Sequence, residues 1–423
     1  AAGDYDPAHR AYRLTLRQTV PPTPGQPAKL PMHIPVLMGL VGADGRDLPL
    51  RLTGEAAPQG TGRVLHLRHA EEVFEFQDVP ARPVPSLLRG FSAPVKLKVD
   101  LADDELAFLM AHDSDAFNRW EAGQTLATRL ILGLVEGRLA EVPDAFVNAV
   151  ARTLETSAAD RALAAQALSL PSEDFLGQQM ATIDVDGIHA ARRLVRRTLA
   201  ERLKDRFVEV YRTNSSNEPF SVDAEAIGRR SLKNMCLGYL MARDDSKAHG
   251  LALEQYRNAQ AMTDTMAALS LLADSGSADR AGVLADFHER WKGYPLVVDK
   301  WLMVQATASR HETLDEVKAL VVHPAFDIRN PNKVYALLRS FGGANPVRFH
   351  DASGAGYAFL ADQLLAIDPR NPQVASRLVK CFARWRAYDS GRQDLMRREL
   401  QRIVATPGLS PDVFEVASKS LDS

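Results

Sequence analysis

Two histidines followed by glutamate come nearest to a hydrolytic metal motif in this sequence. A zinc peptidase carries His-Glu-x-x-His on a helix, which places two imidazoles on one face with a general base beside them. His288 and His311 each precede a glutamate, but the second imidazole is replaced by Lys292 after the first and by Asp315 after the second. Neither motif is complete, so we interpret both histidines as polar residues of exposed helix faces.

Other sequence motifs that carry chemistry are also incomplete. His66 and His69 lie three residues apart in a strand-like segment, so they would point to opposite faces and would not share a metal. There is no Cys-x-x-Cys, no phosphate-binding Gly-rich loop after a strand, and no Gly-x-Ser-x-Gly nucleophile elbow. The residues alone therefore predict no catalytic site and no metal site.

One strongly basic stretch has two interpretations. Its cations are Arg192, Arg193, Arg196, Arg197, Arg202, Lys204 and Arg206. They would suit an anion or a nucleic acid. However, Glu201, Asp205 and Glu209 are interleaved with them, and aromatic side chains for base stacking are few. This mixture favours a solvated helix face.

The overall composition is that of a globular protein with more than one domain. The chain has 423 residues, of which 46% are hydrophobic, and its 51 basic and 53 acidic residues give a net charge of -2. This balance argues against electrostatic binding of nucleic acid by the protein as a whole. No apolar run approaches the roughly 18 residues of a membrane span. The start of the sequence lacks Met and a secretory signal, which suggests that the chain begins inside something longer. Its two distant cysteines indicate a reducing compartment, the cytoplasm.

The first hundred residues have the pattern of a β-sandwich. They contain 13 of the 24 prolines, and short segments alternate with a period of two between Pro/Gly-rich turns. The alternating segments are Tyr12 to Leu16, Leu48 to Leu52, Val73 to Phe76 and Val95 to Val99. Several short alternating strands with turn signals between them favour an antiparallel, Ig-like sandwich at residues 1–100.

After about residue 100 the hydrophobic period changes to that of helices. Leu106, Leu109 and Met110 follow an acidic helix start, and one long apolar stripe runs from Ile188 to Val210. Further helices are predicted near 143–155, 159–169, 223–241, 260–273, 278–291, 296–307, 331–340, 357–367, 371–387, 392–405 and 411–421. Many short helices without strands indicate a solenoid of stacked pairs, HEAT- or armadillo-like, over 101–423. No clean sequence repeat is present, so the units would be irregular.

Specific sequence segments add a resemblance to a known family. They are RGFSAPVKL at 89–97, LAFLMAHD at 106–113, FNRWEA at 117–122, DKW at 299–301, NPN at 330–332 and RNPQVASRL at 370–378. In this order and spacing, the chain resembles the C-terminal half of bacterial aminopeptidase N, a family of gluzincin zinc aminopeptidases. The resemblance extends over essentially all 423 residues.

This resemblance implies a role without a catalytic centre. Family members consist of an N-terminal β domain, a thermolysin-like catalytic domain, a small β-sandwich and a helical solenoid, and this chain resembles the last two. The zinc ion and its ligands would belong to the missing catalytic domain, and no cofactor is expected in this chain. Its implied partners are the missing N-terminal and catalytic domains and peptide substrates, with no nucleic acid and no membrane. The chain would cap the catalytic domain and gate entry, and it would be inactive alone.

Three residues are assigned to the substrate cavity by the resemblance. Gln373 and Arg377 match family residues on a cavity-facing helix, and they lie one helical turn apart. Tyr335 stands where the family can carry an arginine near the cavity, so a phenol replaces the family's charge there. The alternative interpretation of the whole chain is a free-standing scaffold that binds protein partners on its concave face.

Overall fold

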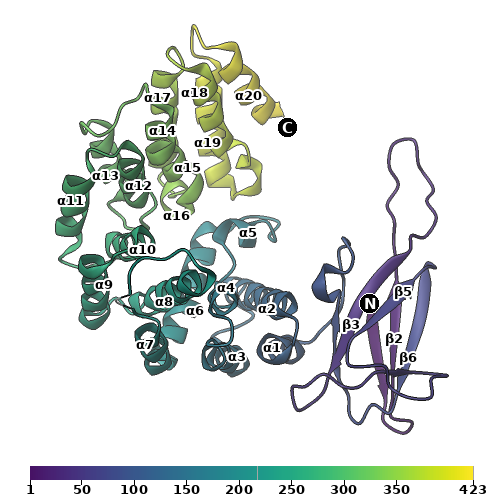
Figure 1. Cartoon of the computed structure of the whole chain (residues 1–423). Coiled ribbons are helices and arrows are strands. Elements are labelled where there is room, and N and C mark those ends of the chain that lie inside the picture. The colour runs from purple at the N-terminus through teal and green to yellow at the C-terminus, as the bar shows by residue number, and fades with distance from the viewer. Residues whose placement is uncertain (217, 423) are drawn as a thin grey trace. The chain divides into compact units, whose positions relative to one another are not determined.

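The computed structural model describes residues 1–216 and 218–422 (Figure 1). The chain begins with seven strands: β1(Ala2–Asp6), β2(Ala11–Arg17), β3(Ile34–Val41), β4(Arg51–Leu52), β5(Arg63–Leu67), β6(Glu71–Gln77) and β7(Val84–Leu87). One antiparallel sheet has the order β1-β2-β6-β4, and a second has the order β5-β3-β7. The two sheets confirm the predicted antiparallel sandwich.

The alternation of side chains explains how the sandwich forms its core. Tyr12, Leu14 and Leu16 on β2 are 3%, 0% and 4% exposed, and Phe76 on β6 is fully buried. Val73 faces the other way and is 52% exposed. Successive residues of a strand point to opposite faces, so this period-two pattern buries one face of the sheet and leaves the other in water.

The predicted strand at residues 95–99 is wrong. The chain from Ser92 to Ala102 has no strand, and Val95 and Leu97 are 42% and 41% exposed. The Lys98 carbonyl accepts a hydrogen bond from the N-terminal amine of Ala1 at 2.7 Å, next to β1, but no ladder continues from this contact. Alternation alone does not make a strand unless a neighbouring strand pairs with it along its length.

Helices follow from Asp103 onward. Their bounds are α1(Asp103–His112), α2(Ala116–Val135), α3(Asp144–Glu155), α4(Arg161–Ala167), α5(Glu173–Gly177), α6(Val185–Arg202), α7(Lys204–Thr213), α8(Ala224–Met241), α9(Ser246–Asn258), α10(Met262–Ala273), α11(Arg280–Trp291), α12(Pro295–Ala306), α13(Thr313–Val321), α14(Pro331–Val334), α15(Ser340–Ala344), α16(Pro346–Phe349), α17(Ala355–Ile367), α18(Pro372–Val379), α19(Ser390–Val404) and α20(Pro411–Asp422). Short helical turns are η1(Arg89–Phe91), the π-helical turn η2(Tyr335–Arg339), η3(Lys380–Phe382) and η4(Trp385–Ala387). In the described ranges no strand interrupts these helices, as predicted.

The chain forms two compact units whose limits differ from the change in hydrophobic period. The first unit contains the sandwich together with residues 101–130 and 141–170, and the second contains residues 131–140 and the chain from Pro171 onward. Inside the first unit, Arg89 of η1 donates to Asp113, the residue that follows α1, at 3.0 Å. A division into domains 1–100 and 101–423 therefore stays a prediction.

A shortened chain tests this division. A chain that begins near residue 100 should keep nearly all the helical circular dichroism, because α1 carries its own start signal. Glu105 accepts a hydrogen bond from the backbone N–H of Ala102 at 2.9 Å, and Asp113 would gain water when Arg89 is lost. Circular dichroism and urea unfolding of both chains measure the result. An unfolded short chain would mean that sandwich and helices share one folding core.

The helices of the second unit follow a curved row (Figure 1) whose later part returns to α6, and we call this arrangement the helical ring. α8, α10 and α12 pack in succession, and the row continues through η2 and α15 toward α18. The last part of the row then meets α6 and the segment before it. We call this junction the seam; it consists of the backbone hydrogen bond from Ile183 to Ala387 at 2.7 Å, the ion pair Asp174–Arg384 at 2.8 Å and the ion pair Asp186–Arg392 at 2.6 Å. The two ion pairs join residues 210 and 206 apart in sequence.

Candidate functional site

The structure brings two of the three predicted site residues together. Arg377 lies on α18 and Tyr335 begins the π-helical turn η2. The Arg377 Nη1 donates to the Tyr335 hydroxyl at 2.8 Å, and its guanidinium carbon lies 5.8 Å from the centre of the tyrosine ring. Gln373 lies one turn before Arg377 and is exposed. Gln373 and Arg377 are thus exposed, whereas Tyr335 is half-buried beneath the guanidinium of Arg377.

The local sequence sets the orientation of α18. The Asn371 side chain caps the helix by accepting from the Val374 N–H at 3.2 Å, and proline occupies the first helical position. Val374 is 4% exposed and Leu378 is fully buried, as the predicted apolar stripe requires. Because this stripe anchors the helix in the stack, Gln373 and Arg377 are left on the solvent side.

A second arginine beside Tyr335 was missed by the sequence reasoning. The guanidinium carbon of Arg339 also lies 5.8 Å from the Tyr335 ring, and this side chain is exposed. Two cations therefore flank one phenol. The π-helical turn that places them has no signature in the sequence, although such turns frequently mark functional sites.

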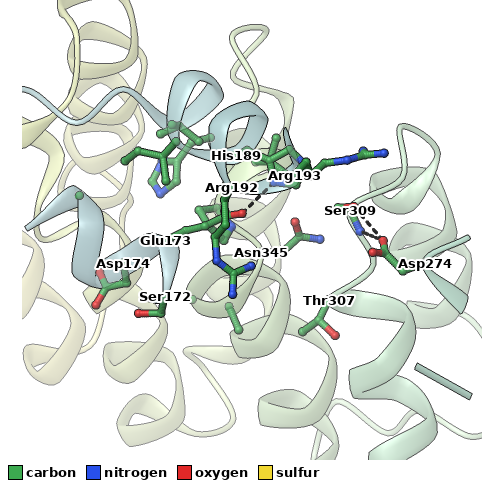
Figure 2. A pocket seen from close by; sticks show the side chains of 18 of the residues that line it. Ser172, Glu173, Asp174, His189, Arg192, Arg193, Asp274, Thr307, Ser309 and Asn345 are labelled. Carbon is green, nitrogen blue, oxygen red and sulfur yellow. Dashed lines mark hydrogen bonds and ion pairs between the residues drawn. The ribbon is translucent and has the colours of Figure 1, made fainter. Parts of the chain in front are cut away.

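The second unit also contains a cavity of about 660 Å³, drawn in Figure 2. Its wall takes segments from the ends of successive helices: Gly238 to Asp244, Leu271 to Ser275, Thr307 and Ser309, Gly342 to Val347, and Lys380 to Arg384. These segments recur at intervals of roughly 35 residues, a spacing typical of two-helix repeats. α6 and the segment before it close the other side. Lys380 lines this cavity, whereas Gln373, Arg377 and Tyr335 are not among its lining residues.

Most acidic groups of the cavity wall are engaged. Glu173 accepts from His189 with 2.8 Å between Oε1 and Nδ1, and Asp174 pairs with Arg384. Asp274 accepts from the Ser309 hydroxyl at 2.8 Å. Figure 2 shows Asp274 and Ser309 joined and Arg192 projecting among the labelled residues. The wall therefore presents fixed acids and a cationic α6 to whatever enters.

The two His-Glu motifs are separate from this cavity. The His288 ring lies 4.6 Å from Trp301 and 5.2 Å from His323 between ring centres, and His311 contacts Arg348 at 3.0 Å. Across residues 1–216 and 218–422, no group of three His, Cys, Asp or Glu side chains is placed to hold a metal ion. The described residues therefore do not fit a zinc site. In the same ranges, no helix is both long and apolar enough to cross a membrane.

Comparison with known proteins identifies relatives along the whole chain. Residues 1–100 match the family model described as a domain of unknown function (DUF3458) with an Ig-like fold, and residues 103–422 match its partner (DUF3458_C), described as ARM repeats. Aminopeptidase N of Escherichia coli K12 is 37% identical over 99% of this chain and 48% of its own length. Aminopeptidase N of Caulobacter vibrioides is 43% identical over 91% of this chain and 43% of its own length.

A solved structure is also similar to this chain along its whole length. The crystal structure of Legionella pneumophila aminopeptidase A in complex with aspartic acid is similar to this chain with a TM-score of 0.82 and 31% identity. It covers 100% of this chain, which spans 48% of that protein. The chain thus spans about half the length of the relatives it matches. It belongs to the family that joins the DUF3458 Ig-like fold to DUF3458_C ARM repeats, and it is homologous over its whole length to bacterial aminopeptidase N.

Proposed function

We propose that this chain is the C-terminal part of a zinc aminopeptidase that removes N-terminal residues from peptides. The observation that carries the proposal is similarity along 99% of the chain to an aminopeptidase N of which it spans 48%. In this proposal the sandwich and the ring of helices cap a catalytic domain and restrict the entry of substrates. The zinc, its ligands and the general base belong to the missing catalytic domain, and the enzyme acts in the cytoplasm.

The described side chains support a binding role rather than a chemical step. Arg377, Tyr335 and Gln373 offer a guanidinium, a phenol and an amide on an accessible surface. These groups donate hydrogen bonds to peptide carbonyls and carboxylates. They orient a peptide and select among side chains, while proton transfer takes place elsewhere.

Comparison of the chain with its parent protein tests the proposal. The isolated chain should hydrolyse no aminoacyl arylamide and hold no stoichiometric zinc. The chain joined to its upstream coding sequence should hydrolyse the arylamide and bind zinc. The reason is that no three-ligand cluster occurs in the part of the chain that the structure describes. Metal analysis and arylamide hydrolysis measure the result. One tight zinc per isolated chain with chelator-sensitive hydrolysis would contradict the proposal.

Substitution of the predicted cavity residues tests the binding role. In the parent enzyme, Gln373→Ala or Arg377→Ala should change KM or substrate preference by a few-fold to tenfold, roughly 1 kcal/mol at a partly wet contact. Zinc content and thermal stability should stay nearly unchanged, because both side chains are exposed. Arg397→Ala is the matched control, since this exposed arginine of α19 pairs with its helix neighbour Asp394 at 2.8 Å. Kinetics that match the control across a peptide panel would refute the assignment.

A further inference from the structure

An arginine with unused hydrogen-bond donors faces the cavity beside the seam. Arg192 of α6 donates through Nε to the Pro171 carbonyl at 2.9 Å. Within the described part of the chain, its two Nη groups have no partner, and Figure 2 shows the guanidinium projecting into the space that the labelled residues surround. Its neighbour Arg196 differs, because it donates to the Gly238 carbonyl at the end of α8 at 2.8 Å. Arg192 therefore does not serve as a helix cap.

Some cations of the cavity wall make no ion pair within the described part of the chain. Three wall acids have partners, and only that of Asp174 is an arginine: Glu173 has His189, Asp174 has Arg384, and Asp244 accepts from His249 at 2.7 Å. By contrast, the side chains of Arg193 and Lys380 have no partner among residues 1–216 and 218–422, and both line the cavity. Three cations thus surround the space without a counter-charge of their own.

The cavity also offers a place for a positive group. α8 and α10 end at Met241 and Ala273, next to lining residues, and helix C-termini carry partial negative charge. Glu173 supplies a full negative charge close to Arg192 and acts on it electrostatically, although the two form no ion pair. A small ligand with a carboxylate at one end and an ammonium at the other meets both features.

The size and geometry of the cavity suit such a ligand. A volume of about 660 Å³ lies within the range of small-molecule pockets. A guanidinium with two free Nη groups matches the two oxygens of a carboxylate in a planar, charge-assisted pair. Burial, and next the positive charge of Arg196, lower the pKa of Arg192, and a bound anion would offset both effects.

We propose that the cavity is a binding site for small zwitterions, free amino acids or dipeptides, with Arg192 holding the carboxylate and Arg193 and Lys380 attracting it. The site is separate from the surface formed by Gln373, Arg377 and Tyr335, and it requires no catalytic domain. It therefore holds or fails independently of the proposed peptidase function.

Calorimetric titration of the 423-residue chain with alanyl-alanine tests the site. We expect saturable binding that weakens as salt is added. The dipeptide amide, which lacks the carboxylate, should bind at least tenfold more weakly. Arg192→Gln should cause a similar loss, because it removes the planar charged fork. Arg197→Gln is the matched control and should bind normally, since Arg197 points to solvent on the same helix and pairs with Glu201 at 2.8 Å.

Further measurements keep the proposal falsifiable. If Arg192→Gln does not fold, Lys380→Gln provides the test, because this exposed side chain has no partner among the described residues whose loss would destabilise the ring. Binding should weaken several-fold. Equal affinity for the dipeptide and its amide would overturn the assignment. Inorganic phosphate that binds as tightly as the dipeptide and competes with it would show an unselective oxyanion site and would also overturn it.

Discussion

Replacing Arg89 by alanine should lower the free energy of unfolding of the first unit by about 3–5 kcal/mol, because it leaves buried carboxylates without a counter-charge. The Arg89 side chain is 8% exposed and bridges Asp47 at 2.7 Å and Asp113 at 3.0 Å. The Asp113 side chain is fully buried, and burial raises its pKa. Burial would also raise the pKa of Asp47, but hydrogen bonds from Arg89 and Ser114 outweigh it and lower that pKa.

Urea unfolding with a matched exposed pair checks this prediction. Arg13→Ala removes an arginine whose side chain is 60% exposed and which pairs with Glu75 at 3.0 Å, so it should cost at most about 1 kcal/mol. The double variant Arg89→Ala/Asp113→Asn should recover part of the loss, because the amide is neutral. An Arg89→Ala variant no less stable than Arg13→Ala would contradict the buried network.

The second large effect expected is a loss of stability of the helical ring in mild acid, caused by His350. This imidazole is 5% exposed and lies between the hydroxyls of Tyr357 and Tyr388, each 2.9 Å from one ring nitrogen. Burial, followed by the charges of Arg392 and Arg384, lowers its pKa to about 3.

The sign of the pH effect follows from this lowered pKa. The unfolded chain takes up a proton at His350 below about pH 6.5, whereas the folded chain resists protonation down to about pH 3. The contribution of His350 to the free energy of unfolding is therefore complete above pH 6.5 and is lost progressively as the pH falls. The loss amounts to about 2 kcal/mol at pH 5.

Unfolding curves between pH 7 and pH 4.5 measure this contribution as the slope of the free energy of unfolding against pH. His350→Gln should flatten the slope of stability against pH, even if its stability at pH 7 is lower, because glutamine does not titrate. His69→Gln, which replaces an exposed imidazole of the sandwich, should leave the slope unchanged. A slope that persists in His350→Gln would assign the acid sensitivity to other groups.

The fold was predictable where the apolar side of a segment packs against a neighbouring element. The alternation at Tyr12, Leu14 and Leu16 identified a strand because the face of β2 that carries them is buried in the core between the two sheets. The same alternation at Val95 and Leu97 did not, because sheet pairing is a property of two segments and cannot be inferred from one. The long apolar stripe from Ile188 to Val210 is divided at Leu203, where φ is -114° and α6 gives way to α7.

In the candidate sites too, the local arrangement of residues was predictable, whereas contacts between distant residues were not. Gln373 and Arg377 were assigned to a substrate cavity by the resemblance alone. Their spacing predicted only that one helix presents both, which α18 does, and their role in a cavity stays a prediction. The contact of Arg377 with Tyr335 joins residues 42 apart, and only the resemblance named both. Arg192 was interpreted with its basic neighbours as part of a solvated face. Its environment depends on segments more than a hundred residues later, which no local pattern reveals.

The seam changes how the helical unit can come apart. A repeat stack with two free ends loses its terminal units one at a time, since each unit touches only its neighbours. Here Asp174 pairs with Arg384 and the Ile183 N–H donates to the Ala387 carbonyl, so the segment before α6 and the turns before α19 hold each other. Backbone amides near the seam should then exchange with solvent as slowly as those of α10 and α12. Such long-range contacts form late, after the intervening helices have stacked. We therefore expect the seam to open before the helices that it joins separate, while α20, which lies beyond it, can fray independently.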